Sequence, residues 1–136
     1  LGGEAWGRGP VILSWADADP NRQNDHSTGS NVVLHEFAHK LDMLNGVANG
    51  MPVLNRDMQR EDWTKHFTYA YNRLLRELEK GHHVAIDPYA AQSPAEFFAV
   101  VTEHFFMTPS HLQSHYPDVY RELVKYYRQN PLARVQ

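Results

Sequence analysis

The spacing of apolar side chains predicts that most of this chain is helical. Apolar residues recur with a period close to 3.6 in several stretches, and residues typical of helix ends bound each stretch. Gly81 terminates the longest stretch, whose apolar stripe consists of Trp63, Phe67, Ala70, Leu74 and Leu78. We therefore expect helices over residues 31–44, 61–80, 94–107 and 118–128.

One strand is expected near the beginning of the chain. Residues 11–15 (VILSW) are mainly apolar and rich in β-branched and aromatic side chains, and they lie between Pro10 and a polar loop. A single strand cannot pair its own backbone groups, and the sequence offers few partner strands. The expected fold class is α+β and mostly helical. Because the chain begins at Leu1, we expect residues 1–136 to be a single domain at the C-terminal end of a longer protein, with the N-terminal part of its sheet missing.

Composition excludes several classes of function. The chain has 136 residues, of which 42% are hydrophobic, as in an ordinary globular domain. Its 13 basic and 16 acidic residues argue against a nucleic-acid binder, and no window approaches the roughly 18 apolar residues of a membrane span. The absence of cysteine excludes disulfides, iron–sulfur clusters and a cysteine nucleophile. The unusual count is that of histidine, which occurs 9 times.

The sequence HEFAH at residues 35–39 predicts a metal site with hydrolytic chemistry. His35 and His39 lie one turn apart on the first predicted helix, so both imidazoles can reach one ion. Zinc suits imidazole nitrogen at about 2.0–2.1 Å. Glu36 lies about 100° further round the helix, where it can act on a water molecule at the ion as a general base. The competing interpretation is two ordinary histidines on a helix face beside an ordinary acid.

Other histidines serve as an internal comparison. His111 and His115 have the same spacing but no glutamate between them, and they fall on a polar stretch between two prolines. His82 and His83 follow the glycine that ends a helix. We interpret all four as surface residues, so much of the histidine excess carries no chemistry.

A catalytic zinc site needs a third protein ligand, and two acids are candidates. Glu96 and Glu103 are seven residues apart and share one face of a largely apolar helix. A carboxylate on a buried helix needs a partner, which a metal ion can be. Each could instead be a capping or surface carboxylate, and spacing alone does not choose between the two.

At this point two motifs reveal a family resemblance. HEFAHKLD at residues 35–42 and DPYAAQSPAEFFAV at residues 87–100 resemble the Mlc titration factor A family of bacterial zinc peptidases, and more distantly the anthrax lethal factor protease domain. The likeness extends over nearly the whole chain, including GPVILSW near its start and YRELVKYYRQNPL near its end. It implies a zincin-like catalytic domain, with residues 11–15 as an edge strand that holds an extended peptide substrate.

The resemblance also implies roles for particular residues. It makes His35, His39 and Glu96 the ligands of one zinc ion, Glu36 the catalytic glutamate and Tyr89 the active-site tyrosine. It chooses Glu96 over Glu103. The implied activity is aminopeptidase-like hydrolysis of peptides in the bacterial cytoplasm.

Some positions stay open. Asp42 belongs to the family pattern and could orient a ligand imidazole or form a salt bridge near the helix end. Glu103 could orient an imidazole in the same way. Lethal factor has an acid four residues after its ligand glutamate, whereas this chain has Val100 there, so any such role is absent or has moved to another residue.

Two other functions compete with the peptidase. The family is named for sequestering the glucose-responsive repressor Mlc, so this chain could be a regulatory binding protein for that partner, with peptidase activity secondary. A purely structural zinc site is weaker, because it would need a fourth protein ligand and no base beside it.

Overall fold

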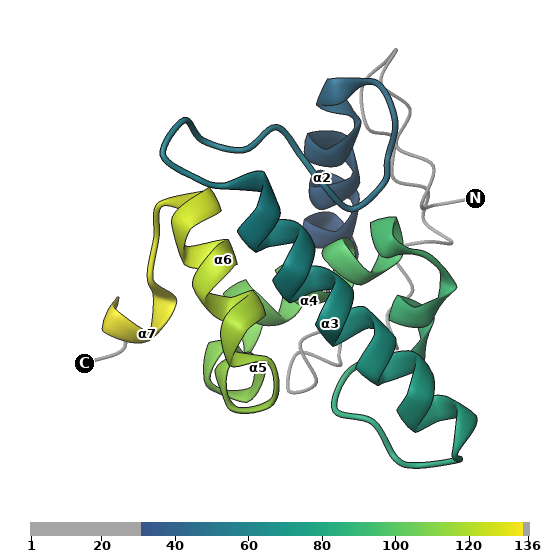
Figure 1. Ribbon diagram of the computed structural model, residues 1–136. Helices are drawn as coiled ribbons and strands as arrows, with labels where there is room; N and C mark the ends of the chain where they lie inside the picture. The colour runs from purple at the N-terminus through teal and green to yellow at the C-terminus, as the bar shows by residue number, and fades with distance from the viewer. Residues whose placement is uncertain (1–30, 135–136) are drawn as a thin grey trace.

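The computed structural model describes residues 31–134, which form a helical assembly (Figure 1). Its elements are α2 (Val32–Asp42), η2 (Met43–Asn45), α3 (Arg60–Glu79), η3 (Pro88–Gln92), α4 (Pro94–Met107), α5 (Pro109–His115), α6 (Pro117–Tyr127) and α7 (Pro131–Arg134). The described residues contain no strand. The strand expected at residues 11–15, and the zincin-like arrangement with it, lie outside the described residues and stay predictions.

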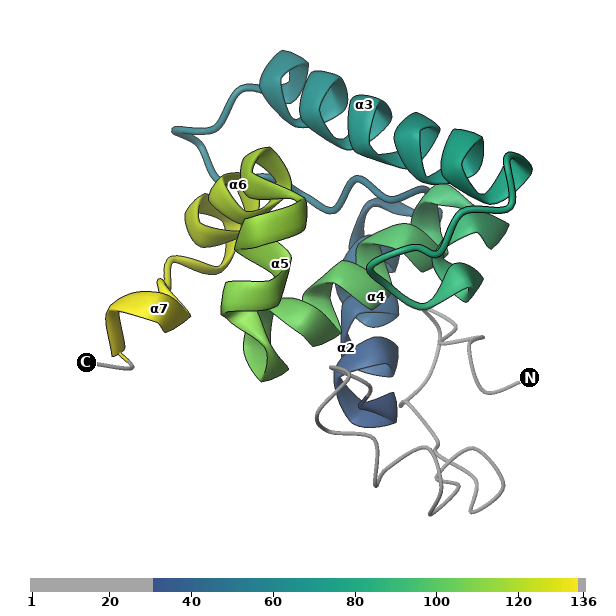
Figure 2. The ribbon, with the colours of Figure 1, turned by 90° about the horizontal axis from the view of Figure 1, so that it is seen from below.

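Helix α4 is the centre of the described fold. Nearly every side chain from its second residue to Phe105 is buried, because α2, η3, α5 and α6 pack against it and aromatic side chains of α3 reach it from the side opposite α2 (Figure 2). On the α3 side, Trp63 and Phe67 stack with ring centroids 4.1 Å apart and meet Phe97 and Phe98 of α4. Each such aromatic pair adds about 0.5–1.5 kcal/mol beyond the area it buries. The core therefore fixes α4, the helix that carries both candidate acids.

The expected helices are confirmed with small changes at their ends. Asn31 caps α2, since its Oδ1 accepts the Leu34 N–H at 3.1 Å, and the Ser93 hydroxyl caps α4 by accepting the Glu96 N–H at 3.1 Å. Gly81 follows α3 with a φ of +74°, which favours glycine. Among these described residues, no helix has both the length and the hydrophobicity needed to cross a membrane.

The segment between Pro109 and Pro117 differs from the sequence prediction. The sequence indicates only a polar stretch between two prolines, with no helix predicted there, but the segment forms helix α5. Both prolines occupy the first turn of a new helix, where the missing N–H is not needed. A proline that ends one helix can thus begin the next after a single residue. His111 and His115 are exposed, as expected, but lie on a helix.

Candidate metal centre

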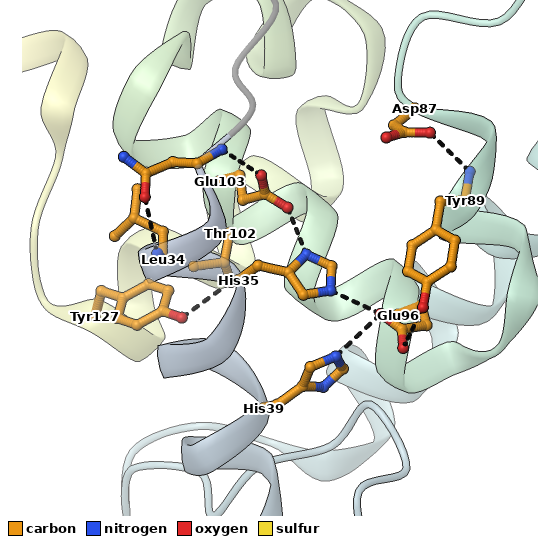
Figure 3. A network of polar contacts seen from close by, with 10 residues as sticks. Leu34, His35, His39, Asp87, Tyr89, Glu96, Thr102, Glu103 and Tyr127 are labelled. Carbon is orange, nitrogen blue, oxygen red and sulfur yellow. Dashed lines mark hydrogen bonds and ion pairs between the residues drawn. The ribbon is translucent and has the colours of Figure 1, made fainter. Parts of the chain in front are cut away.

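His35 and His39 lie on the side of α2 that faces α4. Both are buried, and their ring centroids are 4.8 Å apart in an edge arrangement. Figure 3 shows the two rings converging on one carboxylate. The i, i+4 spacing of the sequence thus places both imidazoles on the same side of the helix.

That carboxylate belongs to Glu96, in the first turn of α4. Its Oε1 lies 2.7 Å from His35 Nε2 and 3.0 Å from His39 Nε2. The Ser93 cap determines the residue at which α4 begins, and so determines which position of the first turn, that of Glu96, faces the histidines of α2. Burial raises the pKa of Glu96, but the hydrogen bonds from the two histidines outweigh burial and lower it to about 2.

Glu103 lies two turns further along α4 and meets the other nitrogen of His35. Its Oε2 is 2.5 Å from His35 Nδ1, and its Oε1 accepts the backbone N–H of Asn31 at 2.5 Å. Glu103 is buried, so the interpretation as a surface carboxylate is wrong for this residue. The two acids, which sequence spacing could not distinguish, therefore have different positions in the structure: Glu96 contacts Nε2 of His35 and Glu103 contacts Nδ1 of the same ring.

Protonation of His35 follows from these two carboxylates. Burial by itself lowers the pKa of His35, but Glu103 and Glu96 together outweigh it and raise the pKa to about 9. The two carboxylates thus favour the imidazolium form of His35, in which each ring nitrogen carries a proton. A metal ion that binds His35 Nε2 must displace the proton that this nitrogen shares with Glu96.

The donor set fits zinc. Ligand atoms of His35, His39 and Glu96 all lie within 4.8 Å of one another, and two imidazoles with one carboxylate are ligands that zinc accepts. Donation of His35 Nδ1–H to Glu103 leaves Nε2 as the nitrogen that can bind the ion. Three protein ligands also match a catalytic zinc site, in which one position stays available.

Tyr89 reaches the same cluster from η3. Its hydroxyl donates to Glu96 Oε2 at 3.2 Å, and its ring centroid is 6.0 Å from that of His35 (Figure 3). The side chain is 43% exposed, so the hydroxyl lies at the open side of the cluster. Sequence reasoning did not single out Asp87, whose Oδ1 accepts the Tyr89 N–H at 2.9 Å and caps η3. An Asp directly before Pro is the signal that indicates such a cap.

The remaining two acids of the first motif are both buried in α2. Glu36 lies between the two histidines in sequence. Asp42 accepts the backbone N–H groups of Asn49 at 3.1 Å and Gly50 at 2.7 Å. The loop after α2 thus folds back over the end of the helix, and the Asp42 carboxylate also interacts electrostatically with His39, so its expected role in orienting an imidazole or forming a salt bridge stays a prediction. Asp42 fastens that loop.

Known proteins resemble this chain over most of its length. Residues 1–128 match the family described as glucose-regulated metallo-peptidase M90. The chain is 40% identical to Mlc titration factor A of Pectobacterium atrosepticum and 38% identical to that of Yersinia pestis, covering 98% of this chain and 50% and 49% of those proteins. An uncharacterized protein of Synechocystis is 45% identical over 96% of this chain and 47% of its own length.

The chain thus spans about half the length of the curated relatives it matches. The similarity covers the whole described structure up to Arg128, including the histidine–glutamate cluster. The family resemblance predicted from the two motifs is confirmed. The chain belongs to the M90 family of glucose-regulated metallo-peptidases, the family of the Mlc titration factor A proteins.

Proposed function

We propose that this chain carries the catalytic centre of a zinc peptidase that hydrolyses peptide bonds in an aminopeptidase-like manner in the bacterial cytoplasm. The observation that carries the proposal is the convergence of His35 Nε2, His39 Nε2 and the Glu96 carboxylate from two helices. Membership of a metallopeptidase family supports it. Helices α2 and α4 pack directly against each other and share one apolar core with α3, which supports the pre-organisation that such a site requires.

In this proposal His35, His39 and Glu96 hold one zinc ion. When bound, zinc supplies a Lewis acid that polarises the substrate carbonyl and lowers the pKa of water. The protein's part is to present three ligands on rigid helices and to keep the site largely dry. Burial of both histidines serves the second purpose, since electrostatic interactions are stronger where water is excluded.

Glu36 is the proposed general base. It follows His35 directly on α2, so its side chain projects about 100° round the helix from that ligand. From there the carboxylate can accept the proton of the attacking water and pass it to the leaving amine. Glutamate suits both steps because its carboxyl group can take up and release a proton near neutral pH when its surroundings raise its pKa.

Tyr89 is proposed to stabilise the negative charge that develops on the carbonyl oxygen. Its hydroxyl is already a hydrogen-bond donor at the open side of the cluster, 3.2 Å from Glu96 Oε2. When a substrate carbonyl oxygen enters from this side, the Tyr89 hydroxyl can donate its hydrogen bond to that oxygen instead of to Glu96. The Asp87 cap fixes the backbone of Tyr89 and so limits where the hydroxyl can move.

Glu103 is proposed as a positioning residue. Its carboxylate accepts hydrogen bonds from His35 Nδ1–H and from the backbone N–H of Asn31, the residue that caps α2. This ties the ring of a ligand to the start of its own helix. Partners of this kind fix the ring orientation and raise the basicity of the ligand nitrogen.

Replacement of the proposed base tests the peptidase function. Glu36→Gln keeps the size of the side chain and removes its ability to accept a proton, so the variant should bind zinc like the wild type and hydrolyse an aminopeptide substrate at least about a hundredfold more slowly. Glu122→Gln is the matched control, since Glu122 is equally buried but pairs with His66 between α3 and α6. Full activity of Glu36→Gln, or no activity of the zinc-loaded wild type, would contradict the proposal.

A second candidate function is regulation by binding the repressor Mlc. It rests on the printed name of the relatives, Mlc titration factor A. Peptide hydrolysis and repressor binding can coexist, and the Glu36→Gln variant separates them. If the second function holds, the inactive variant should retain purified Mlc in a pull-down as well as the wild type does. Absence of Mlc from both pull-downs would eliminate it.

A further inference from the structure

A second group of histidines gathers away from the candidate metal centre. A recess of about 320 Å³ lies where α3, α5 and the segment after α3 meet. Its lining carries three imidazoles and two charged side chains, from Arg73, Glu77, His83, His111 and His115, together with Val84 and Ala85. The proposed peptidase chemistry uses none of these residues.

Helix α5 brings two of the imidazoles together. His111 and His115 are one turn apart, and their ring centroids are 4.7 Å apart. An i, i+4 pair on one helix face can bind one ion with both rings, as in the first site.

The backbone sets the tautomer of His111. Its Nε2 lies 2.6 Å from the carbonyl oxygen of Ala85, and a carbonyl can only accept, so Nε2 carries the hydrogen. The neutral ring therefore has its lone pair on Nδ1. A ligand histidine in metalloproteins typically donates its other ring nitrogen to a carbonyl or carboxylate in this way.

Two further donors line the same recess from other elements. His83 belongs to the segment that the Ala85 contact ties to α5, and Glu77 lies in the last turns of α3. Arg73 holds the opposite end of α5 by donating to the His115 carbonyl at 2.6 Å. Glu77 is only loosely paired, since its Oε2 is 3.9 Å from Arg73 Nε.

We propose that His83, His111 and His115 form a second site for a divalent transition metal, with Glu77 as an additional oxygen ligand. Unlike the first cluster, these donor atoms are not gathered within 4.8 Å of one another. All three residues are exposed, however, and the rings of His83 and His115 can turn toward an ion at Nδ1 of the anchored His111 ring. Imidazole-rich sites bind Cu²⁺ most tightly among divalent first-row metals.

A bound ion would join three elements and restrain the segment that leads into η3. His83 lies six residues before Tyr89, with Asp87 between them. The second site would therefore brace the chain just ahead of the tyrosine at the candidate centre. The proposal of a second metal site does not depend on the proposed peptidase function, and the two can be tested independently.

Copper titration of the protein already loaded with zinc tests the proposal. We expect the wild type to bind one further Cu²⁺ with nitrogen ligation visible by electron paramagnetic resonance. His111→Ala and His115→Ala should each weaken this binding at least about tenfold, because each removes a ligand. His83→Gln should weaken it too, whereas His82→Ala, which alters the neighbouring exposed histidine, should leave it unchanged.

All four substitutions replace exposed side chains, so the variants should fold, which circular dichroism can verify. Equal copper affinity in the wild type and the two α5 variants would overturn the proposal. So would equal weakening by His82→Ala, because that result indicates diffuse surface binding. Copper binding of the described kind that persists in Glu96→Ala, which lacks a ligand of the first site, would support the second site regardless of the first.

Discussion

Glu103→Gln tests how the protein prepares His35 for a metal ion. The glutamate accepts two N–H groups, from His35 Nδ1 and from the Asn31 backbone, each at 2.5 Å. Glutamine has one carbonyl oxygen and one amide NH₂, so it can accept only one of these hydrogens. Its NH₂ must then face the other donor, or His35 must move its hydrogen to Nε2, the nitrogen that a metal needs.

The size of the effect follows from that conflict. A buried donor left without an acceptor costs about 1–3 kcal/mol. Expressed as binding, this corresponds to roughly 5- to 150-fold in affinity, and substitutions of residues that orient metal ligands typically cost about 10- to 100-fold. We therefore expect zinc affinity to fall about 10- to 100-fold while the site still fills at saturating zinc.

Chelator competition measures this change, with Glu122→Gln as the control. Glu122 accepts from His66 Nδ1 at 2.9 Å and is as buried as Glu103, so its substitution also disturbs a histidine–carboxylate pair whose acid is buried. The control should lose some thermal stability and keep its zinc affinity. If Glu103→Gln binds zinc within about twofold of the wild type, or if both variants lose affinity equally, the positioning role is refuted.

Three other substitutions give distinct outcomes. Burial and the charge of a neighbouring histidine lower the pKa of His104 from 6.5 to about 4, so between these pH values the unfolded chain binds a proton at this residue and the folded chain does not. Urea titrations should therefore show that the unfolding free energy of the wild type falls by about 3 kcal/mol more than that of His104→Gln between pH 6.5 and 4. Parallel pH profiles of the two proteins would contradict this. Gly50→Ala places its Cβ 2.7 Å from the Pro94 carbonyl oxygen at a φ of +84°, and its thermal midpoint should drop well below that of Gly81→Ala, which meets no neighbour. Tyr89→Phe should lower kcat about 10²–10³-fold with zinc content unchanged, and unaltered kcat would remove the tyrosine from the mechanism.

Periodicity and capping residues predicted the long helices well. The stripe from Trp63 to Leu74 is buried as expected, and Ser93 begins α4 where the sequence indicated. These features are local, so their signals lie within a few residues of one another. Helix α5 was missed for the same local reason, because Pro109 signals both the end of one helix and the beginning of the next.

Features of the candidate site that depend on tertiary packing were harder to predict. Glu96 and Glu103 occupy equivalent positions on one helix face, and only the placement of α2 shows which nitrogen of His35 each one meets. The partners of Asp42 could not be predicted for the same reason, because they are backbone N–H groups of a loop whose conformation does not follow from hydrophobic periodicity or capping residues. The resemblance supplied the choice of Glu96 that spacing could not.

Zinc that survives desalting, measured by elemental analysis, tests the central claim most directly. The account predicts about one tightly held zinc per chain in the wild type. It predicts loss of that zinc in Glu96→Ala and its retention in Glu103→Gln after loading. A wild type that holds no zinc, or a Glu96→Ala variant that retains it, would contradict the assignment of His35, His39 and Glu96 as the metal ligands.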